Sequence, residues 1–459
     1  MAQFRARSEM PASAEAVFAW HARPGALERL LPPWDRTRVL EREGGIAPGG
    51  RVVLELHLGP APVRWVARHT DYEPGRLFRD VQEEGPFARW VHTHLTTPID
   101  EATSTLEDLI DYEPPLGPLG QVVGGPMVHA MLERQFRFRH ARTRLDLERH
   151  APYRGEAPWR IALTGATGML GTQLAAFLTT GGHTVVPLVR RPVRAGEAAI
   201  RWDPERGELD PADLEGFDAV IHLAGENIAG GRWTPDRKAR ILKSREAGTR
   251  LLGTTLARLE RKPRVWISAS GAGFYGDRGD EILTEASAGG QGFLAEVCRA
   301  WEAGTEPARQ AGIRVVNLRI GVVMTPSGGA LAKQLIPYEL GLGGPVGSGR
   351  QYLSWIDEDD LMGVVLHALH TDSLEGPVNA TSPEPVPNAG FARALGHVLH
   401  RPAVMPLPTP AVLALFGQMG QEALLEGQRV LPQRLLDTGF RFAHPNLEAS
   451  LGYQLGRAT

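Results

Sequence analysis

Cysteine is nearly absent from this chain of 459 residues. Its one cysteine, Cys298, excludes an internal disulfide and any metal site built from several thiolates. Lysine is almost as scarce, because only four of the 50 basic residues are lysines. Coding bias explains such a preference for arginine, but the scarcity also limits which catalytic motifs the chain can contain. The four are Lys238, Lys243, Lys262 and Lys333.

Long apolar runs and a strong excess of one charge are also missing. No run approaches the ~18 residues of a membrane-spanning helix, and residues 1–9 lack the apolar stretch of a signal peptide. The formal net charge is −3, which does not favour nucleic acid as the main partner. We therefore expect a cytoplasmic globular protein that has neither a membrane nor a nucleic-acid partner.

The length predicts two or three domains at roughly 150 residues each. A polar stretch with two prolines and a glycine, at 148–158, predicts a boundary. The first domain, 1–150, has an α+β pattern. A helix is expected to begin after Pro11 with Ser13 as its N-cap, and a long helix closes the domain at about 120–149. Alternating apolar residues predict strands at 51–58, 63–69 and 90–95.

After the boundary, short apolar strands alternate with helical lengths of chain. Repeated strand–helix–strand units predict a doubly wound, Rossmann-like parallel sheet of the α/β class. We expect this domain at 159–459, with a C-terminal substrate lobe. The expected strands are 160–164, 184–189, 219–223, 265–268 and 314–319, and the first helix is expected at 169–180.

A glycine pattern lies on the first strand-to-helix turn, the position where such a pattern predicts dinucleotide binding. Gly165 permits the tight turn, Gly168 lets a pyrophosphate approach the backbone, and Gly171 lets the helix pack closely on the strand. The phosphates would bind at the helix N-terminus. The predicted contacts in this loop are Gly165, Thr167, Gly168, Met169, Leu170 and Gly171.

The second expected strand ends in Arg190 and Arg191, with no acidic residue to bind the ribose 2′-hydroxyl of NAD. A guanidinium at this position is suited to the 2′-phosphate of NADP, which it binds with two hydrogen bonds. This pattern favours NADP(H) as the cofactor. The alternative is a pair of solvated surface arginines in an arginine-rich chain.

Residues 159–459 resemble the epimerase-like branch of the atypical short-chain dehydrogenases/reductases, whose members are sometimes called cell-division inhibitors. The segment at about 400–452 is similar to that family's own C-terminal domain. The resemblance implies NADP(H) contacts at the glycine loop, Arg190, Leu223, Ala224 and Arg245, and around Val323. Gly225 and Ser268 complete the predicted site. The matching stretches are 222–229, 231–234, 243–249, 268–277, 293–302 and 341–351.

Residues 1–150 resemble START-like or polyketide-cyclase-like proteins, on the stretches 11–18 and 31–34. The resemblance implies a helix-grip fold, in which a curved sheet wraps a long C-terminal helix. It also implies a hydrophobic small molecule in the cavity between helix and sheet. The alternative is a domain that only packs against its neighbour.

Catalytic residues are harder to assign, because short-chain dehydrogenases usually use a Tyr-x-x-x-Lys motif. The residues four places before the lysines are Thr234, Ala239, Arg258 and Gly329, so the chain has no such motif. Usual dehydrogenase or sugar-epimerase chemistry is therefore in doubt. Ser270 and Tyr275 are the candidate substitutes, since both follow the strand at 265–268. The alternatives are a hydroxyl bonded to the turn backbone for Ser270 and a packing aromatic for Tyr275.

Three other polar patterns are interpreted structurally. Thr234 is expected to cap a helix that carries the basic residues after it. Asp357 and the acidic residues that follow it are expected to cap another helix. His92 and His94 lie on one strand face, but no carboxylate lies near them in the sequence, so no metal site is expected.

Two functions remain open from the sequence. The first is an NADP(H)-dependent oxidoreductase or epimerase-like enzyme that acts on an unidentified small molecule, with Ser270 and Tyr275 as catalytic residues. The second is a non-catalytic NADP(H)-sensing protein, which the missing Tyr-x-x-x-Lys motif favours. A fused ligand-binding domain is consistent with both.

Overall fold

The computed structural model describes residues 2–59, 61–115 and 117–457. The chain divides into two compact units. One comprises Met1–Ala157 with Ala176–Gly182, and the other comprises Pro158–Ala175 with His183–Thr459. None of the helices in these described ranges is long and apolar enough to cross a membrane.

The first unit contains a seven-stranded antiparallel sheet in the order β1-β7-β6-β5-β4-β3-β2. Along β7, buried side chains alternate with half-buried ones, as expected when one face of the sheet is covered. The three strands expected from the sequence correspond to β3, β4 and β6 and are confirmed. The strands are β1 (Ala2–Met10), β2 (Arg38–Glu43), β3 (Arg51–Leu58), β4 (Ala61–Glu73), β5 (Leu77–Glu84), β6 (Arg89–Pro98) and β7 (Ser104–Glu113).

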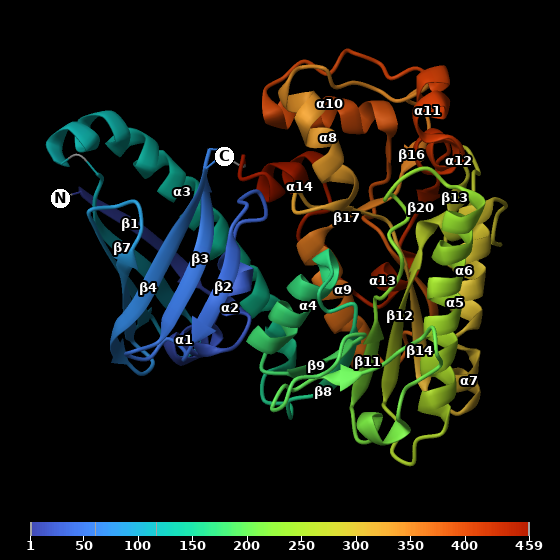
Figure 1. Ribbon diagram of the computed structural model, residues 1–459, viewed down its shortest axis with the longest axis horizontal. Helices are drawn as coiled ribbons and strands as arrows, with labels where there is room; N and C mark the ends of the chain where they lie inside the picture. The colour runs from blue at the N-terminus through green and yellow to red at the C-terminus, as the bar shows by residue number, and fades with distance from the viewer. Residues whose placement is uncertain (1, 60, 116, 458–459) are drawn as a thin grey trace. The chain divides into compact units, whose positions relative to one another are not determined.

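Helices complete the helix-grip arrangement of this unit. α1 (Ala14–Ala22) and α2 (Ala26–Leu30) connect β1 to β2, and Ser13 caps α1 by accepting a hydrogen bond from the Ala16 N–H. The long helix α3 (Gly117–His150) lies across the sheet (Figure 1). Its residues Leu132 and Phe136 pack on an apolar cluster of β1 and β7, so burial of this helix face holds the unit together.

The second unit is built on a parallel sheet in the order β10-β9-β8-β11-β12-β14-β18. Its central strands are buried along their whole length, as expected for a sheet covered on both faces. The expected doubly wound fold is confirmed. The strands are β8 (Arg160–Thr164), β9 (Thr184–Val189), β10 (Ile200–Arg201), β11 (Ala219–His222), β12 (Val265–Gly271), β14 (Arg314–Ile320) and β18 (Gly376–Ala380).

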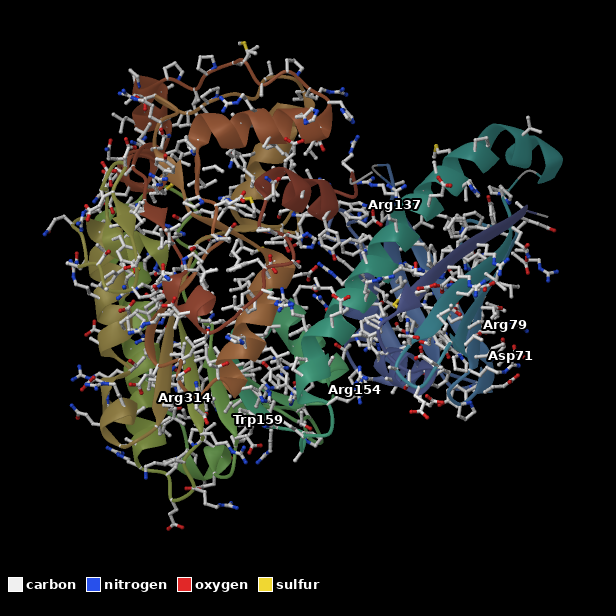
Figure 2. The ribbon with its side chains drawn as sticks, turned by 180° about the vertical axis from the view of Figure 1, so that it is seen from behind. Asp71, Arg79, Arg137, Arg154, Trp159 and Arg314 are labelled. Atoms are coloured by element: carbon white, nitrogen blue, oxygen red, sulfur yellow. The ribbon has the colours of Figure 1, made fainter. Side chains whose placement is uncertain are left out.

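Helices cover both faces of this sheet (Figure 1). α4 (Met169–Thr180) and α9 (Glu358–His370) lie on one face, and α5 (Pro235–Ala257), α6 (Phe293–Ala303) and α7 (Glu306–Gln310) lie on the other. Trp159 and Arg314 mark the end at which the parallel strands begin (Figure 2). The carboxyl ends of the strands therefore meet at the opposite edge, and chain order reverses there between β8 and β11. Such a switch point is where open α/β sheets bind ligands.

The remaining segments form a C-terminal lobe. Its core includes Trp355, Phe391 and Leu451, all fully or almost fully buried. The expected caps are confirmed, because Thr234 accepts from the Arg237 N–H and Asp357 accepts from the Asp359 N–H. The lobe and its connections contain α8 (Gly329–Glu339), α10 (Asn388–Leu399), α11 (Thr409–Phe416), α12 (Gln418–Gly420), α13 (Gln433–Asp437), α14 (Leu447–Gln454), β13 (Ile282–Leu283), β15 (Val322–Met324), β16 (Tyr352–Leu353), β17 (Trp355–Asp357), β19 (Val386–Pro387) and β20 (Arg429–Val430).

Candidate functional site

The glycine loop joins β8 to α4 at the switch point. Gly165 has φ +73°, which favours glycine, and the Gly168 N–H donates to the Gly165 carbonyl oxygen at 2.9 Å. A Cβ atom on Gly171 would lie 2.0 Å from the same oxygen, so only glycine fits there. Thr167 and Gly168 are exposed just before α4 begins, while Met169 and Leu170 are half-buried in its first turn. The loop can therefore present backbone N–H groups to an anion.

The turn after β11 lies directly against this loop. A Cβ on Gly165 would come within 3.0 Å of the Ala224 nitrogen. The N–H groups of Leu223 and Ala224 both point at Thr164 Oγ1, at 3.2 Å each. Thr164 thus joins the ends of the two strands that flank the switch point.

A buried histidine extends the hydrogen bonds around Thr164. His222 Nδ1 lies 2.7 Å from Thr164 Oγ1, and its Nε2 lies 3.1 Å from Thr249 Oγ1. The Thr249 hydroxyl donates to the Arg245 carbonyl oxygen at 2.7 Å, so it accepts from His222. Nε2 therefore carries the ring proton. Burial, together with the charge of Arg245, lowers the pKa of His222 to about 3 and keeps the ring neutral. Sequence reasoning missed this residue, although a polar residue at a strand end was a signal.

Arg245 supports the same turn from the side. Its Nη1 donates to the Glu226 and Ile241 carbonyl oxygens at 2.9 and 3.2 Å, and its guanidinium lies 4.7 Å above the Trp301 ring. A Cβ on Gly225 would come within 3.1 Å of the guanidinium carbon. Arg245 is 8% exposed. Its predicted contact with the cofactor stays a prediction.

The segment that joins β15 to α8 lies beside the glycine loop. Val323 on β15 is half-buried. A Cβ on Gly328 would lie 2.8 Å from the Met169 sulfur, so the approach to α8 lies beside the first residue of α4. Residues predicted around Val323 and in the glycine loop are thereby brought close together.

Arg190 and Arg191 differ in their surroundings although both are exposed. Arg191 forms a bidentate ion pair with Glu197, and this hydrogen bonding lowers the pKa of Glu197 to about 2. Arg190 has neither a hydrogen bond nor an ion pair within the described part of the chain. Its guanidinium is thus the one available to a ligand at the end of β9.

The two candidate catalytic residues belong to one buried network. Ser270 Oγ donates to Glu302 Oε1 at 2.8 Å, and Arg319 binds both carboxylate oxygens of Glu302 at 2.8 Å. Arg319 Nη1 also donates to the Tyr275 hydroxyl at 3.0 Å. Sequence reasoning missed that Glu302 and Arg319 join the two hydroxyls, because packing of α6 on the sheet brings these residues together.

Tyr275 lies in the interior and not in an open cleft. Its side chain is 0% exposed, and its hydroxyl lies 2.7 Å from Asn379 Oδ1 and 3.0 Å from the Thr284 carbonyl oxygen. Burial raises the pKa of Tyr275 despite the nearby Arg319. Ser268 is also fully buried, in the middle of β12, which extends beyond the expected strand and contains Ser270. The catalytic roles of Ser270 and Tyr275 stay predictions.

The first unit contains a partly open cavity of about 1130 Å³. Leu54, Trp65, Trp90, Leu132 and Phe136 contribute to a mainly apolar lining that comes from the sheet and α3. This volume slightly exceeds the usual range for small-molecule sites, about 300–1,000 Å³. The cavity can accommodate a hydrophobic molecule of substantial size.

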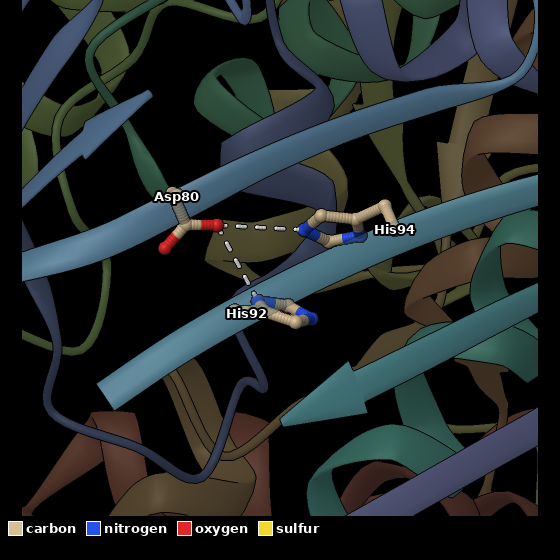
Figure 3. A group of neighbouring side chains, drawn as sticks. All are labelled: Asp80, His92 and His94. Carbon is tan, nitrogen blue, oxygen red and sulfur yellow. Dashed lines mark ion pairs between the residues drawn. The ribbon is translucent and has the colours of Figure 1, made fainter. Parts of the chain in front are cut away.

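Two carboxylates, those of Asp80 and Asp108, lie beside His92 and His94 in space, although none is near these histidines in the sequence. Asp80 Oδ2 on β5 lies 3.5 Å from His92 Nδ1 and 3.7 Å from His94 Nε2 (Figure 3). Asp108 on β7 lies 2.9 Å from His92 Nε2 and 2.6 Å from His94 Nδ1. Sequence reasoning missed both carboxylates because strand pairing brings them there.

The charges in this cluster are strongly coupled. Burial opposes the charge of His94, but the carboxylates of Asp108 and Asp80 outweigh it and raise the pKa of His94 to about 9. Burial likewise opposes ionisation of Asp108. The charge of His94 and hydrogen bonds from His140 and His92 nevertheless hold the pKa of Asp108 well below its usual value. The cluster therefore stabilises a positive charge at the cavity wall.

Comparison with known families assigns each part of the chain. The family described as "NAD dependent epimerase/dehydratase family" matches residues 161–380. The family described as "Polyketide cyclase / dehydrase and lipid transport" matches residues 1–148. A domain of unknown function matches residues 407–453.

Similar proteins support the same assignment. The chain is 41% identical over 297 residues to an epimerase family protein of Mycobacterium bovis, which covers 65% of this chain and 98% of that protein. A solved nucleoside-diphosphate sugar epimerase from Corynebacterium glutamicum has 32% identity and a TM-score of 0.80, and covers 99% of this chain and 91% of that one.

A human relative has been solved with a bound nucleotide. The structure of human epimerase family protein SDR39U1 with NADPH has 36% identity and a TM-score of 0.59, and covers 64% of this chain and 99% of that one. The resemblances expected for both parts of the chain are thereby confirmed. By its identity to relatives over nearly their full length, this chain belongs to the epimerase family, with a polyketide cyclase-like domain preceding its epimerase domain.

Proposed function

We propose that this chain binds NADPH at the carboxyl edge of its parallel sheet and acts as an oxidoreductase or epimerase-like enzyme on a small molecule. The glycine loop carries this proposal. Gly171 has no side chain where it faces the Gly165 carbonyl oxygen, so the loop can pack tightly there. The loop leads directly into α4, a helix of 12 residues. The structure of human SDR39U1 with NADPH supports the same cofactor.

Arg190 supports NADPH in preference to NADH. It follows β9 directly, is exposed, and is followed by Arg191 instead of a carboxylate. A guanidinium there offers paired donors to a 2′-phosphate, whereas NAD-binding folds usually place an acidic residue near the ribose. Arg191, already paired with Glu197, would contribute mainly through its charge.

When bound, NADPH would supply a hydride at its nicotinamide ring. The chain's own residues would bind and orient it: Thr164 joins the turns on either side of the switch point, and Arg245 supports the Leu223–Ala224 turn. Ser270 and Tyr275 are the proposed donors to a substrate oxygen. Their hydroxyls are engaged with Glu302 and with Asn379, so substrate binding would have to displace one of these contacts.

The cavity in residues 1–150 supports a second part of the proposal, the binding of a hydrophobic small molecule. Its apolar lining and its volume of about 1130 Å³ favour such a ligand. The described family of this domain includes lipid transport proteins, which is consistent with an apolar ligand.

A non-catalytic NADPH sensor is the second candidate function. The missing Tyr-x-x-x-Lys motif favours it, as does the burial of Tyr275, whose hydroxyl accepts from Arg319 and is hydrogen-bonded on its other side to Asn379. In this alternative the nucleotide would act as a regulatory ligand without turnover.

Calorimetric titration of the full chain with NADPH and NADH tests the cofactor proposal. We expect tighter binding of NADPH, and absence of binding for both nucleotides would overturn it. Transfer of deuterium from labelled NADPH to a compound in fractionated cell extract then separates the two functions. Transfer would exclude the sensor, whereas a chain that binds NADPH but transfers no deuterium in any fraction would support it.

A further inference from the structure

Three side chains on adjacent strands form a set of potential metal ligands in the wall of the cavity. Asp80 on β5 and His92 on β6 are direct partners in the antiparallel register, and His94 lies two residues further along β6 on the same face. All three line the cavity. Asp80 and His94 have side-chain exposures of 14% and 11%, and that of His92 is 7%.

The nitrogen and oxygen atoms of this set face one another across a gap (Figure 3). Asp80 Oδ2 lies 3.5 Å from His92 Nδ1 and 3.7 Å from His94 Nε2, and all three ligand atoms lie within 4.8 Å of one another. These separations are too long for good hydrogen bonds. The two distances from Asp80 Oδ2 are close to the roughly 3.3–3.6 Å between two ligands that each lie ~2.0–2.2 Å from a tetrahedral zinc ion.

Asp108 provides the outer contacts that metal-binding histidines usually have. The ring nitrogens that face away from Asp80 both lie near Asp108 Oδ1. His92 Nε2 is hydrogen-bonded to it at 2.9 Å, whereas His94 Nδ1 lies 2.6 Å away without the geometry of a hydrogen bond. The other oxygen of Asp108 lies 2.6 Å from His140 Nε2. The hydrogen bond to Asp108 fixes the ring orientation and tautomer of His92, and leaves its opposite nitrogen free to bind a metal.

We propose that Asp80, His92 and His94 bind one divalent transition-metal ion whose open coordination position faces the cavity. Two imidazoles and one carboxylate suit zinc, iron or cobalt better than magnesium or calcium. Three protein ligands leave a position for water or for a ligand oxygen. The cavity would then take a molecule with an apolar body and one carbonyl or carboxylate oxygen, which the ion binds and polarises.

This proposal is independent of the nucleotide site, because its ligands all belong to the first unit. The metal therefore has its own test on the tag-free full chain. After removal of metals with a chelator, the protein is titrated with Co²⁺ and its visible absorption is recorded. We expect d–d bands that saturate at one equivalent and disappear on addition of Zn²⁺. Absence of bands, together with less than a tenth of an equivalent of Zn²⁺ retained after dialysis, would overturn the proposal.

Variants assign the ion to these ligands. Asp80→Asn and His92→Gln should each weaken Co²⁺ binding by more than a hundredfold, and Asp108→Asn by about 10- to 100-fold with unchanged stoichiometry. His57→Gln is the matched control, since His57 lines the same cavity but bonds the Arg36 carbonyl oxygen outside the cluster. Equal binding by the wild type, Asp80→Asn and His92→Gln would place the ion elsewhere and overturn the proposal.

Folding of each variant is checked by near-ultraviolet circular dichroism, which is sensitive to the cavity residues Trp65 and Trp90. If Asp80→Asn or His92→Gln does not fold, the wild-type titration still decides whether one ion binds. The Asp108→Asn and His57→Gln variants then decide where it binds.

Discussion

Arg319 binds both carboxylate oxygens of Glu302 at 2.8 Å. The same guanidinium donates to the Tyr275 hydroxyl at 3.0 Å, and is the cation that would have to lower the pKa of that phenol. Glu302 offsets its charge, and burial raises the pKa of Tyr275 instead. Tyr275 is therefore placed to hold or donate a proton and not to act as a phenolate base at neutral pH.

Replacement of Tyr275 by phenylalanine tests both roles of its hydroxyl. The change leaves Arg319 without one acceptor, so we expect the free energy of unfolding to fall by about 1–3 kcal/mol. If Tyr275 is catalytic, turnover is lost while NADPH affinity is unchanged. Denaturant unfolding and calorimetry measure the two effects, and a variant with full turnover removes Tyr275 from the mechanism.

Replacement of Gly171 by alanine tests whether the glycine loop between β8 and α4 binds the nucleotide. The added Cβ would lie 2.0 Å from the Gly165 carbonyl oxygen, so the loop must move. We expect at least a tenfold loss of NADPH affinity and a stability loss of about 1–3 kcal/mol from overpacking. Gly45→Ala is the control, because nothing lies within 4 Å of its Cβ position. Unchanged NADPH affinity in Gly171→Ala would argue against nucleotide binding at this loop.

Replacement of Arg190 by alanine tests the preference for the 2′-phosphate. Loss of charge-assisted hydrogen bonds of about 1.5–3 kcal/mol should weaken NADPH binding about 10- to 100-fold. NADH affinity should stay the same, since NADH lacks this phosphate. Arg191→Ala is the matched neighbour and should have a smaller effect, because Arg191 is paired with Glu197. An equal loss for NADPH and NADH would contradict the assignment of Arg190.

Stability should fall in acid because His222 is buried in its neutral form. Its pKa is lowered to about 3 in the folded chain, whereas an unfolded histidine has a pKa of about 6.5. Between these values the unfolded chain binds the extra proton. His222 therefore makes stability decrease as pH falls, by at most ~1.4 kcal/mol per pH unit.

Thermal unfolding from pH 7 to pH 4 measures this effect. The His222→Gln variant should show a shallower acid slope than the wild type. Because His21, with its pKa lowered to about 4 mainly by burial, acts in the same direction, the slope in His222→Gln should not vanish. An unchanged slope in His222→Gln would show that His222 is not buried neutral.

Local features of this protein were predictable from the sequence by itself. Ser13, Thr234 and Asp357 cap helices by bonding to an N–H two or three residues away, so the information lies within one turn. The alternation of strands and helices predicted the α/β class of the second unit for the same reason. The glycine loop was likewise predictable, because its glycines directly follow a strand and precede a helix in the sequence. Gly165 has a φ of +73°, a backbone conformation that favours glycine.

The tertiary structure alone decided which distant side chains meet. Asp80 faces His92 because β5 and β6 pair in one register, and a shift of one residue would turn Asp80 to the other face of the sheet. Ser270 and Tyr275 are joined through Glu302 on α6 and Arg319 on β14, which packing of helix on sheet brings together. Burial then determines their protonation, because the cost of removing a charge from water depends on the whole surrounding fold.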